Sequence, residues 1–263
     1  MSEASPTRID RLLGGRVLLE QPVRGYRVAV DPVLLAAAAP ARPGDVVLDA
    51  GAGSGAVSLC LRARVPGLRI VALERDPGLF ACLCRNVERN GARAEIEPVQ
   101  GDLLKPPPTI SRQSFSLVLT NPPFLPRGAG TLSPDPQRTG AVVESVDLKS
   151  WFDACLRRLA PRGRLVAIHR AGRLDALVAH LAGGCGELRL FPLWPFAHSA
   201  EAKRVILSAR KGVRGEAHLL RGLVLHRADG RFTEEAEAVL REGLAIAALA
   251  SPVAPRRATR ERG

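Results

Sequence analysis

An Asn-Pro-Pro-Phe segment at residues 121–124 carries the most specific chemistry in the sequence. Proline has no backbone N–H and a fixed φ, so two prolines make the segment stiff and unable to continue a strand ladder. The side-chain carbonyl of Asn121 and the backbone carbonyl of Pro122 then act as two rigid acceptors for a planar NH₂ group. Accepting both protons directs the nitrogen lone pair at an electrophile, while Phe124 stacks on the attached ring. An ordinary turn is the alternative. The candidate catalytic residues are Asn121, Pro122, Pro123 and Phe124.

A glycine-rich turn, Asp-Ala-Gly-Ala-Gly-Ser-Gly, occupies residues 49–55 after a short apolar run. Glycine lets the backbone approach a ligand closely, and the free N–H groups of a following helix attract its polar groups. The segment also fits the dinucleotide fingerprint if Ala56 takes the last position. By itself the turn is therefore compatible with a nicotinamide cofactor, with another nucleotide, or with a tight turn that binds nothing.

Acidic residues follow the next two apolar runs. Glu74 ends the second run, where a carboxylate can accept ribose hydroxyl protons, and Asp102 follows the third, where it can accept from an adenine amino group. Each alone would more often be a cap or a solvated turn residue. Because carboxyl ends of parallel strands meet at one edge, where open α/β sheets bind ligands, their recurrence predicts a nucleoside-containing cofactor. The candidate cofactor-binding residues are Asp49, Gly51, Gly53, Gly55, Glu74, Asp102, Leu103 and Asn121.

Strands that alternate with helices of about ten residues indicate βαβ units and a mostly parallel, doubly wound α/β sheet. The expected strands are 46–50, 69–74, 94–99, 115–120, 164–169, 189–193 and 204–209. The last connection is too short for a parallel crossover, so we expect six parallel strands and one antiparallel edge strand. The expected helices are 31–39, 54–64, 77–90, 149–159 and 173–181. We expect an extra strand or hairpin at 212–226, and Thr233 as the cap of a last helix.

The length predicts one large domain with appendages. We expect four parts along the chain: an N-terminal covering segment at 1–44, a catalytic domain at 45–211, a C-terminal extension at 212–250, and a basic tail at 251–263.

The charge balance of 38 Lys plus Arg against 26 Asp plus Glu gives a net charge of +12. Such an excess favours a nucleic-acid partner through phosphate neutralisation, although it also serves solubility. The five cysteines lack C-x-x-C spacing and the five histidines lack metal-binding spacing, so we expect free thiols in a reducing cytoplasm and no metal site. The first ten residues are polar and no apolar stretch approaches the roughly 20 residues of a membrane span, so we expect neither a secretory signal nor a membrane span.

Together, the glycine turn, the two acidic positions and the Asn-Pro-Pro-Phe segment resemble class I S-adenosylmethionine-dependent N-methyltransferases. The flanks narrow the resemblance to the bacterial family that N6-methylates adenine in the anticodon region of a valine tRNA. The flanking segments are LLGGRV (12–17), QP (21–22), GYR (25–27), DPVLLA (31–36) and DGRFT (229–233). The resemblance runs from about residue 9 to residue 243, with Ala52 and Ala56 making the turn slightly bulkier than a pure glycine run.

The resemblance implies a role for each matching residue and makes tRNA the expected partner. The three glycines of the turn would face the methionine part of S-adenosylmethionine, Glu74 its ribose and Asp102 its adenine. Asn121 and Pro122 would orient the target nitrogen. Tyr26 and Asp31 would close over the cofactor, with Asp31 as a plain helix cap the equal alternative.

Other acceptors and other classes stay open at this stage. A glutamine amide in a release factor or ribosomal protein, or a guanine N2 amine in rRNA, also presents NH₂ to such a motif. The glutamine-specific enzymes usually carry Tyr at the position of Phe124 and a separate helical N-terminal domain, which favours RNA here. A nicotinamide-dependent dehydrogenase would explain the glycine turn and Glu74 but not residues 121–124. A non-catalytic RNA-binding module with the same fold is the remaining alternative.

Overall fold

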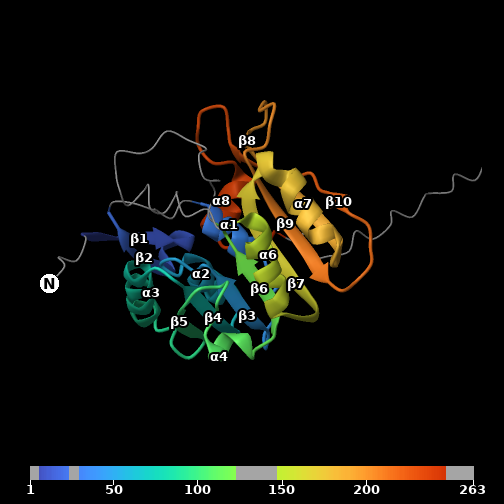
Figure 1. Cartoon of the computed structure of the whole chain (residues 1–263). Coiled ribbons are helices and arrows are strands. Elements are labelled where there is room, and N and C mark those ends of the chain that lie inside the picture. The colour runs from blue at the N-terminus through green and yellow to red at the C-terminus, as the bar shows by residue number, and fades with distance from the viewer. Residues whose placement is uncertain (1–5, 24–29, 123–146, 247–263) are drawn as a thin grey trace, which may run out of the picture.

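The computed structural model describes residues 6–23, 30–122 and 147–246. Figure 1 shows a central sheet with helices on both of its faces. The strands that form the main part of this sheet are β3 (Val46–Ala50), β4 (Arg69–Glu74), β5 (Ile96–Gln100), β6 (Phe115–Thr120), β7 (Leu159–Arg170), β8 (Cys185–Phe196) and β9 (Arg204–Lys211). Their alternation with helices confirms the predicted doubly wound α/β sheet.

The order across the sheet is β10 (His218–Leu219), β8, β9, β7, β6, β3, β4, β5. Six strands, β3 to β8, run in one direction and β9 runs antiparallel to both of its neighbours, as the short connection before it predicts. The expected edge position of the antiparallel strand is wrong, because β9 lies between β7 and β8. Residues 205–209 are all buried, and a continuous buried run is typical of an interior strand whose two faces are both covered.

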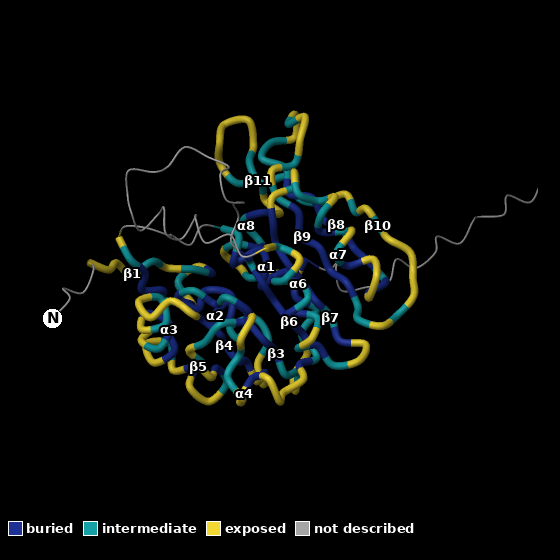
Figure 2. The backbone as a smooth tube through the Cα atoms, in the orientation of Figure 1, coloured by how far each residue is buried: buried dark blue, intermediate teal, exposed yellow. Residues whose placement is uncertain are grey.

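Two layers of apolar side chains cover the two faces of the sheet. One layer contains residues of α1 (Asp31–Ala38), α2 (Ala56–Arg64), α3 (Pro77–Arg89) and α8 (Glu234–Leu240). The other contains residues of α4 (Pro108–Ser111), α6 (Leu148–Arg158) and α7 (Leu174–Ala182). Figure 2 shows the buried strands enclosed between these layers. Among the described helices, none combines the length and apolar character that crossing a bilayer requires.

An N-terminal hairpin, which the sequence analysis did not predict, packs against α3. Its strands β1 (Thr7–Leu12) and β2 (Val17–Pro22) are joined by the short helix η1 (Leu13–Gly15). The Asn86 side chain accepts from the Glu20 N–H (2.6 Å) and donates to the Glu20 carbonyl (2.7 Å), so it pairs with β2 as a neighbouring strand would. The Glu20 carboxylate contacts Arg85 (2.9 Å) and Arg89 (3.0 Å), and the Arg85 hydrogen bond lowers the pKa of Glu20. The hairpin is thus fixed to the domain by buried polar contacts.

The C-terminal extension returns to the outer edge of the sheet and then to the N-terminal half. β10 (His218–Leu219) and β11 (Leu223–His226) both pair parallel to β8, so they form an added edge and not a hairpin with each other. Thr233 caps α8 by accepting from the Ala236 N–H, as predicted. After α8, the Ile246 N–H donates to the Ala37 carbonyl (2.8 Å), which ties the extension to α1.

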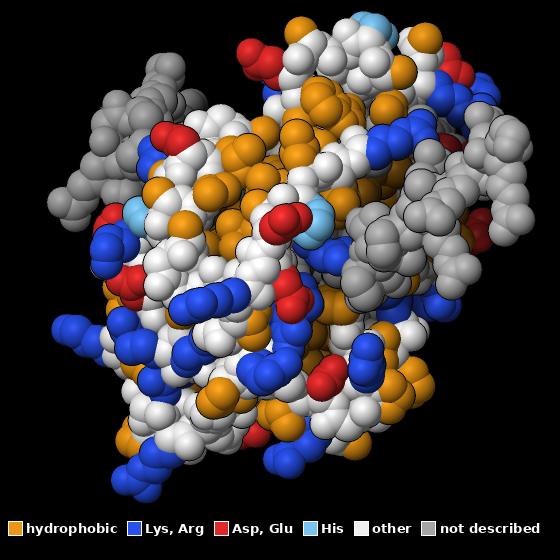
Figure 3. All heavy atoms as spheres, turned by 90° about the vertical axis from the view of Figure 1, so that its right-hand side faces the viewer, with side chains coloured by type: hydrophobic (Ala, Val, Ile, Leu, Met, Phe, Trp, Pro, Cys, Tyr) orange, Lys and Arg blue, Asp and Glu red, His pale blue; other side chains and the backbone are white. Residues whose placement is uncertain are grey.

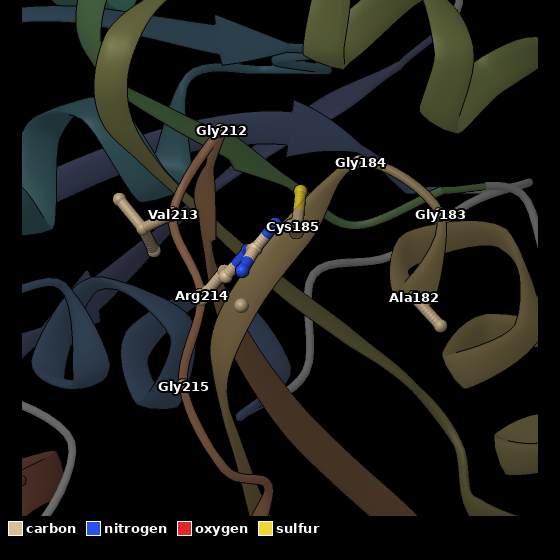
Figure 4. A pocket seen from close by; sticks show the side chains of 9 residues that line it. Ala182, Gly183, Gly184, Cys185, Gly212, Val213, Arg214 and Gly215 are labelled. Atoms are coloured by element: carbon tan, nitrogen blue, oxygen red, sulfur yellow. The ribbon is translucent and has the colours of Figure 1, made fainter.

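A glycine-rich hollow lies at the amino end of β8, drawn in Figure 4, and is lined by residues 182–186 and 212–215. A Cβ at Gly186 would lie 2.5 Å from the Val213 carbonyl oxygen, so close packing of two backbones requires glycine there. The hollow is at the end of the strand opposite to the carboxyl edge of the sheet, where the predicted site residues lie.

Candidate active site

The glycine-rich turn at the end of β3 and the start of the Asn-Pro-Pro-Phe segment after β6 lie side by side, because β3 pairs with both β4 and β6. Ala50 is in register with Leu73 on one side and with Thr120 on the other. The next residues along the three strands are Gly51, Glu74 and Asn121, so all three stand at one edge of the sheet. Adjacent strands are separated by about 4.8 Å, and the sheet therefore brings together residues that are up to 70 positions apart in sequence.

The three glycines of the turn have different surroundings although all have positive φ: +77° at Gly51, +58° at Gly53 and +91° at Gly55. A Cβ at Gly51 would lie 3.1 Å from the Trp151 ring, and one at Gly55 would lie 2.6 Å from Leu83. A Cβ at Gly53 would meet no atom of the described ranges within 4 Å. Packing within the chain therefore explains two of the glycines, while Gly53 presents open backbone that a ligand can approach.

Glu74 is buried and fixed by backbone donors. Its Oε1 accepts from the N–H groups of Arg75 (2.8 Å) and Asp76 (2.7 Å), and its Oε2 accepts from the Gly53 N–H (2.7 Å). Burial raises the pKa of Glu74, while these three hydrogen bonds oppose the rise. Because Oε2 accepts one N–H from the residues that the structure describes, it keeps capacity for a ligand hydroxyl. The carboxylate is thus held directly beside the open part of the glycine turn.

Asp49 has a different environment from Glu74 although both are buried acids at neighbouring strand ends. Its Oδ2 accepts from the hydroxyl (2.6 Å) and the N–H (3.2 Å) of Ser58, which joins β3 to α2. Burial raises the pKa of Asp49 to about 6, and the Ser58 hydrogen bonds partly oppose this. In the structure, the Asp49 carboxylate bonds to Ser58 of the chain itself. Contact between Asp49 and a cofactor stays a prediction.

Asp102 and Leu103 follow β5, next to β4 in the sheet. The Asp102 side chain accepts from the Leu104 N–H (2.8 Å), lies 3.8 Å from the Arg75 guanidinium and is one-third exposed (33%). Leu103 is buried in the apolar layer that contains α4. Asp102 is therefore accessible to a ligand, whereas the buried Leu103 anchors the segment after β5 in the apolar layer.

A hydrogen-bond chain that sequence reasoning missed joins the glycine turn to the Asn-Pro-Pro-Phe segment. The Thr120 hydroxyl donates to the Ala50 carbonyl (2.9 Å) and accepts from the Trp151 indole N–H (2.9 Å). The Trp151 ring also packs on Gly51. Its position in α6, some 30 residues after the motif, gave no local sign of this contact; the only available signal was its rarity, since the chain has two tryptophans.

The remaining predicted residues have three outcomes. Asn121 is half-buried and Pro122 buried at the end of β6. Pro123, Phe124 and Tyr26 lie outside the described residues. Asp31 as the helix cap is wrong, because Val30 is the N-cap and Asp31 lies in the first turn of α1.

Asp31 is nonetheless at the carboxyl edge of the sheet. Its carboxylate contacts the Arg204 guanidinium at 3.0 Å, and Arg204 pairs with Arg170 at the end of β7. This ion pair fixes the start of α1 over the same edge as Asn121. A contact between Asp31 and a cofactor remains a prediction.

Metal and thiol chemistry have no evident site in the part of the chain that the structure describes. No group of three or more His, Cys, Asp or Glu is arranged there to hold a metal ion. All five cysteines are free and four of them are buried; burial raises the pKa of Cys60 to about 12. Such thiols stay protonated and are poor nucleophiles. The arrangement instead suits the binding and orientation of a nucleoside-containing ligand next to a polar acceptor pair.

Comparison with known proteins adds family and fold. Residues 29–133 match the methyltransferase small domain. A tRNA1(Val) (adenine(37)-N6)-methyltransferase of Porphyromonas gingivalis is 30% identical over 227 residues, which are 82% of this chain and 88% of the relative. A protein of the same name from Aeromonas hydrophila is 28% identical and covers 79% and 86%. A release factor glutamine methyltransferase of Geobacter sulfurreducens is 39% identical over 80 residues, but these are 30% of this chain and 26% of that protein.

Solved structures confirm the fold. A predicted O-methyltransferase from Agrobacterium tumefaciens has a TM-score of 0.67 at 21% identity and covers 82% of this chain and 97% of its own. The 16S rRNA N2 G1207 methyltransferase of Thermus thermophilus, solved with AdoMet and guanosine, has a TM-score of 0.54 at 21% identity, with 78% and 50% covered. The sheet is therefore of the Rossmann-like methyltransferase type that the sequence predicted.

Proposed function

Because the chain belongs to the tRNA1(Val) (adenine(37)-N6)-methyltransferase family, we propose that it transfers a methyl group from S-adenosylmethionine to the N6 amine of an adenine in the anticodon region of a valine tRNA. Membership in this family excludes the nicotinamide-dependent dehydrogenase. A tRNA substrate also supports a cytoplasmic location. We further propose the division of labour expected from the sequence, with residues 45–211 catalytic and the segments 1–44 and 212–250 covering and extending the site.

The residues at the carboxyl edge fit S-adenosylmethionine. The Gly53 backbone is open where Gly51 and Gly55 are closed by the chain's own side chains, and Glu74 holds an acceptor oxygen beside it. We assign Glu74 to the ribose, Asp102 to the adenine amino group and the turn around Gly53 to the methionine part. When bound, this cofactor supplies an electrophilic methyl group on a sulfonium.

Asn121 and Pro122 supply the second half of the reaction. Their carbonyl oxygens would accept the two N6 protons of the target adenine and leave the nitrogen lone pair aimed at the methyl group. Positioning supplies most of the rate enhancement because the electrophile is already activated, so no strong general base is required. Phe124 is assigned to stacking on the flipped base, which reduces the cost of extruding it from the loop.

The observation that carries this proposal is the register of β3 with β6. It places Ala50 of the glycine-rich turn opposite Thr120, the residue before the Asn-Pro-Pro-Phe segment. The Thr120 hydroxyl then bonds the two strands at that level. Two motifs with separate tasks, cofactor binding and amine binding, are thus one strand spacing apart, as an in-line transfer between them requires.

A second candidate acceptor is the glutamine amide of a release factor. It is favoured by one finding, the 39% identity over 80 residues to the Geobacter sulfurreducens enzyme. That match is confined to 26% of that enzyme, whereas the match to the tRNA enzyme of Porphyromonas gingivalis extends over 88% of its length. Recognition of the acceptor depends on surfaces outside the shared motifs, so we favour tRNA.

The test is methyl transfer with defined acceptors. The purified chain is incubated with labelled S-adenosylmethionine and with tRNA, rRNA or release factor from a strain that lacks the enzyme. We expect label in N6-methyladenosine from valine tRNA, identified by nucleoside mass spectrometry. Label in glutamine or in N2-methylguanosine, with none in adenosine, would overturn the proposal.

A further inference from the structure

Four aromatic rings form one continuous cluster at the outer edge of the sheet. Phe196 stacks on His198 with ring centroids 5.3 Å apart and planes 16° apart. Phe196 also contacts His226 at 5.6 Å, and His226 stacks on Phe232 at 4.8 Å with planes 22° apart. His198 is exposed and the other three are half-buried. We call these four residues the ring platform; of its rings, that of His198 is the one exposed to solvent.

Two short turns hold the ring platform in place. In the first, the Phe196 N–H donates to the Ser199 hydroxyl and the Ser199 N–H donates to the Phe196 carbonyl, both at 3.0 Å. In the second, a His226 ring nitrogen lies 3.1 Å from the Gly230 carbonyl, and the Arg227 N–H donates to the Arg231 carbonyl (2.8 Å). Rings that are ordered before binding lose little conformational entropy when a ligand stacks on them.

The ring platform stands beyond the same sheet edge as Asn121. Following the register from Thr120 across β7 and β9 leads to Leu190 in β8. Phe196 is six residues farther along, about 20 Å at 3.3 Å per residue, and three strand spacings aside, about 14 Å. Asn121 is one residue beyond Thr120, so its separation from Phe196 is about 22 Å. Figures 1 and 2 show the end of β8 and β11 projecting from one end of the molecule.

The charges around the ring platform are mostly compensated within the chain. Residues 194–204 and 218–234 contain five Lys or Arg and three Asp or Glu. Arg227 contacts Glu234 (3.1 Å) and Arg231 lies 3.8 Å from Asp229. Over the molecule as a whole the balance is strongly positive, +12, and Figure 3 shows Lys and Arg side chains spread across one face. The positive charge that attracts phosphates is therefore spread over the surface of the molecule, whereas the ring platform itself offers mainly apolar contact.

We propose that the ring platform stacks an unpaired base of the tRNA several nucleotides away from the target adenine. This inference rests on the proposed function, since it names how the same substrate is held. A polyanion is the partner that the net charge favours, and a nucleobase is the part of it that matches a flat ring face. The distance to Asn121 excludes the target base itself as the occupant.

The experiment combines substitutions that keep apolar bulk with one that restores a ring. Phe196→Leu together with Phe232→Leu removes stacking, and Phe196→Trp retains it. Loss of a base–aromatic stack weakens binding by about 5- to 150-fold, so we expect the KM for tRNA to rise at least about fivefold in the leucine variant. The kcat and the affinity for S-adenosylhomocysteine should stay unchanged. The tryptophan variant should behave as the wild type.

Two controls keep the result specific. His218 in β10 lies on the same outer edge of the sheet, but it pairs with Arg189, seven residues before Phe196 in β8. His218→Leu should therefore leave the KM for tRNA unchanged. A short RNA with the target adenine and one neighbour on each side should not distinguish the leucine variant from the wild type. Because stacking neutralises no phosphate, the slope of log affinity against log salt should also be the same for both proteins.

Three outcomes are decisive. A KM for tRNA within twofold of wild type in the leucine variant would overturn the platform. The platform would also be overturned if Phe196→Trp raised the KM for tRNA as the leucine variant does and both variants had a lower melting temperature. The rings would then serve only the fold. If the wild type transfers no methyl group to tRNA, the proposed function fails, and direct binding of tRNA to the same variants by filter retention still decides the platform.

Discussion

The strands β3 to β6 and the strands β7 to β11 present polar and aromatic groups at the same edge of the sheet in two different ways. In the first half, each group ends its strand or follows it directly, as Glu74, Gly51 and Asn121 do. Backbone N–H groups hold the Glu74 carboxylate, and the Thr120 hydroxyl bonds β6 to β3 at the residue before Asn121. In the second half, β8 continues past the edge, and the rings come from the ends of β8 and β11 and from the turns after them. A small reactive site needs groups fixed at the distance of one strand spacing, whereas contact with a large partner needs a surface that extends away from it.

The largest expected effect is on the kcat and comes from a substitution in the first half, at Asn121. Asn121→Ala removes one of the two acceptors proposed for the target amine. By analogy with loss of one preorganised donor in other active sites, the kcat should fall at least about 10²- to 10³-fold. Calorimetric titration should show S-adenosylhomocysteine binding unchanged. If both are lost together, Asn121 binds the cofactor and not the amine.

Two glycine substitutions sharpen the difference between groups that serve the ligand and groups that serve the fold. Gly55→Ala places a Cβ against Leu83, and overpacking typically costs about 1–3 kcal/mol of unfolding free energy. Gly53→Ala places a Cβ with no described atom within 4 Å and should cost less stability, about 1 kcal/mol for its positive φ, but should weaken cofactor binding more. Denaturant unfolding and calorimetry on both variants check this. The opposite ranking would place the cofactor elsewhere.

The buried Asp49 of the first half offers a pH test. The pKa of Asp49 is raised from 3.8 to about 6, so its charged form destabilises the folded state, fully so above pH 6. This cost decreases as the pH falls from 6 towards 3.8, because the folded state then binds the proton first. Asp49→Asn should therefore be more stable relative to wild type at pH 8 than at pH 5, by about 1–2 kcal/mol. Urea unfolding at both values measures it, and a difference that does not vary with pH would contradict the assignment.

The smallest expected effect concerns the tie between the motifs. Trp151→Phe keeps a ring on Gly51 but removes the hydrogen bond to Thr120, which is worth about 1 kcal/mol. We expect the kcat to fall about five- to tenfold with little change in the KM for tRNA. Trp194→Phe is the matched control, because its indole N–H donates to the Arg221 carbonyl (3.2 Å) at the outer edge of the sheet. Equal effects of the two substitutions would show a general loss of stability.

Local patterns predicted most of the first half and the start of the last helix. The glycine turn, the acidic end of β4, the Pro at the start of α3 and the Thr233 cap depend on residues within a few positions of one another, and all of these elements occur where expected. The N-terminal hairpin was missed because its strands are mixed in polarity, with burial that depends on α3. The position of β9 was missed because a short connection sets strand direction but not which neighbours the strand joins.

The sequence by itself determined that an apolar strand ends in a flexible turn, that a carboxylate ends the next one, and that two prolines stiffen the segment after the fourth, since backbone chemistry acts over a few residues. Only the tertiary structure decided that Trp151 bonds to Thr120, that Glu74 bonds to Gly53 while Asp49 bonds to Ser58, and that rings 30 positions apart meet. Those contacts depend on strand order and register, and these are set by the packing of the entire apolar core and not by any short segment.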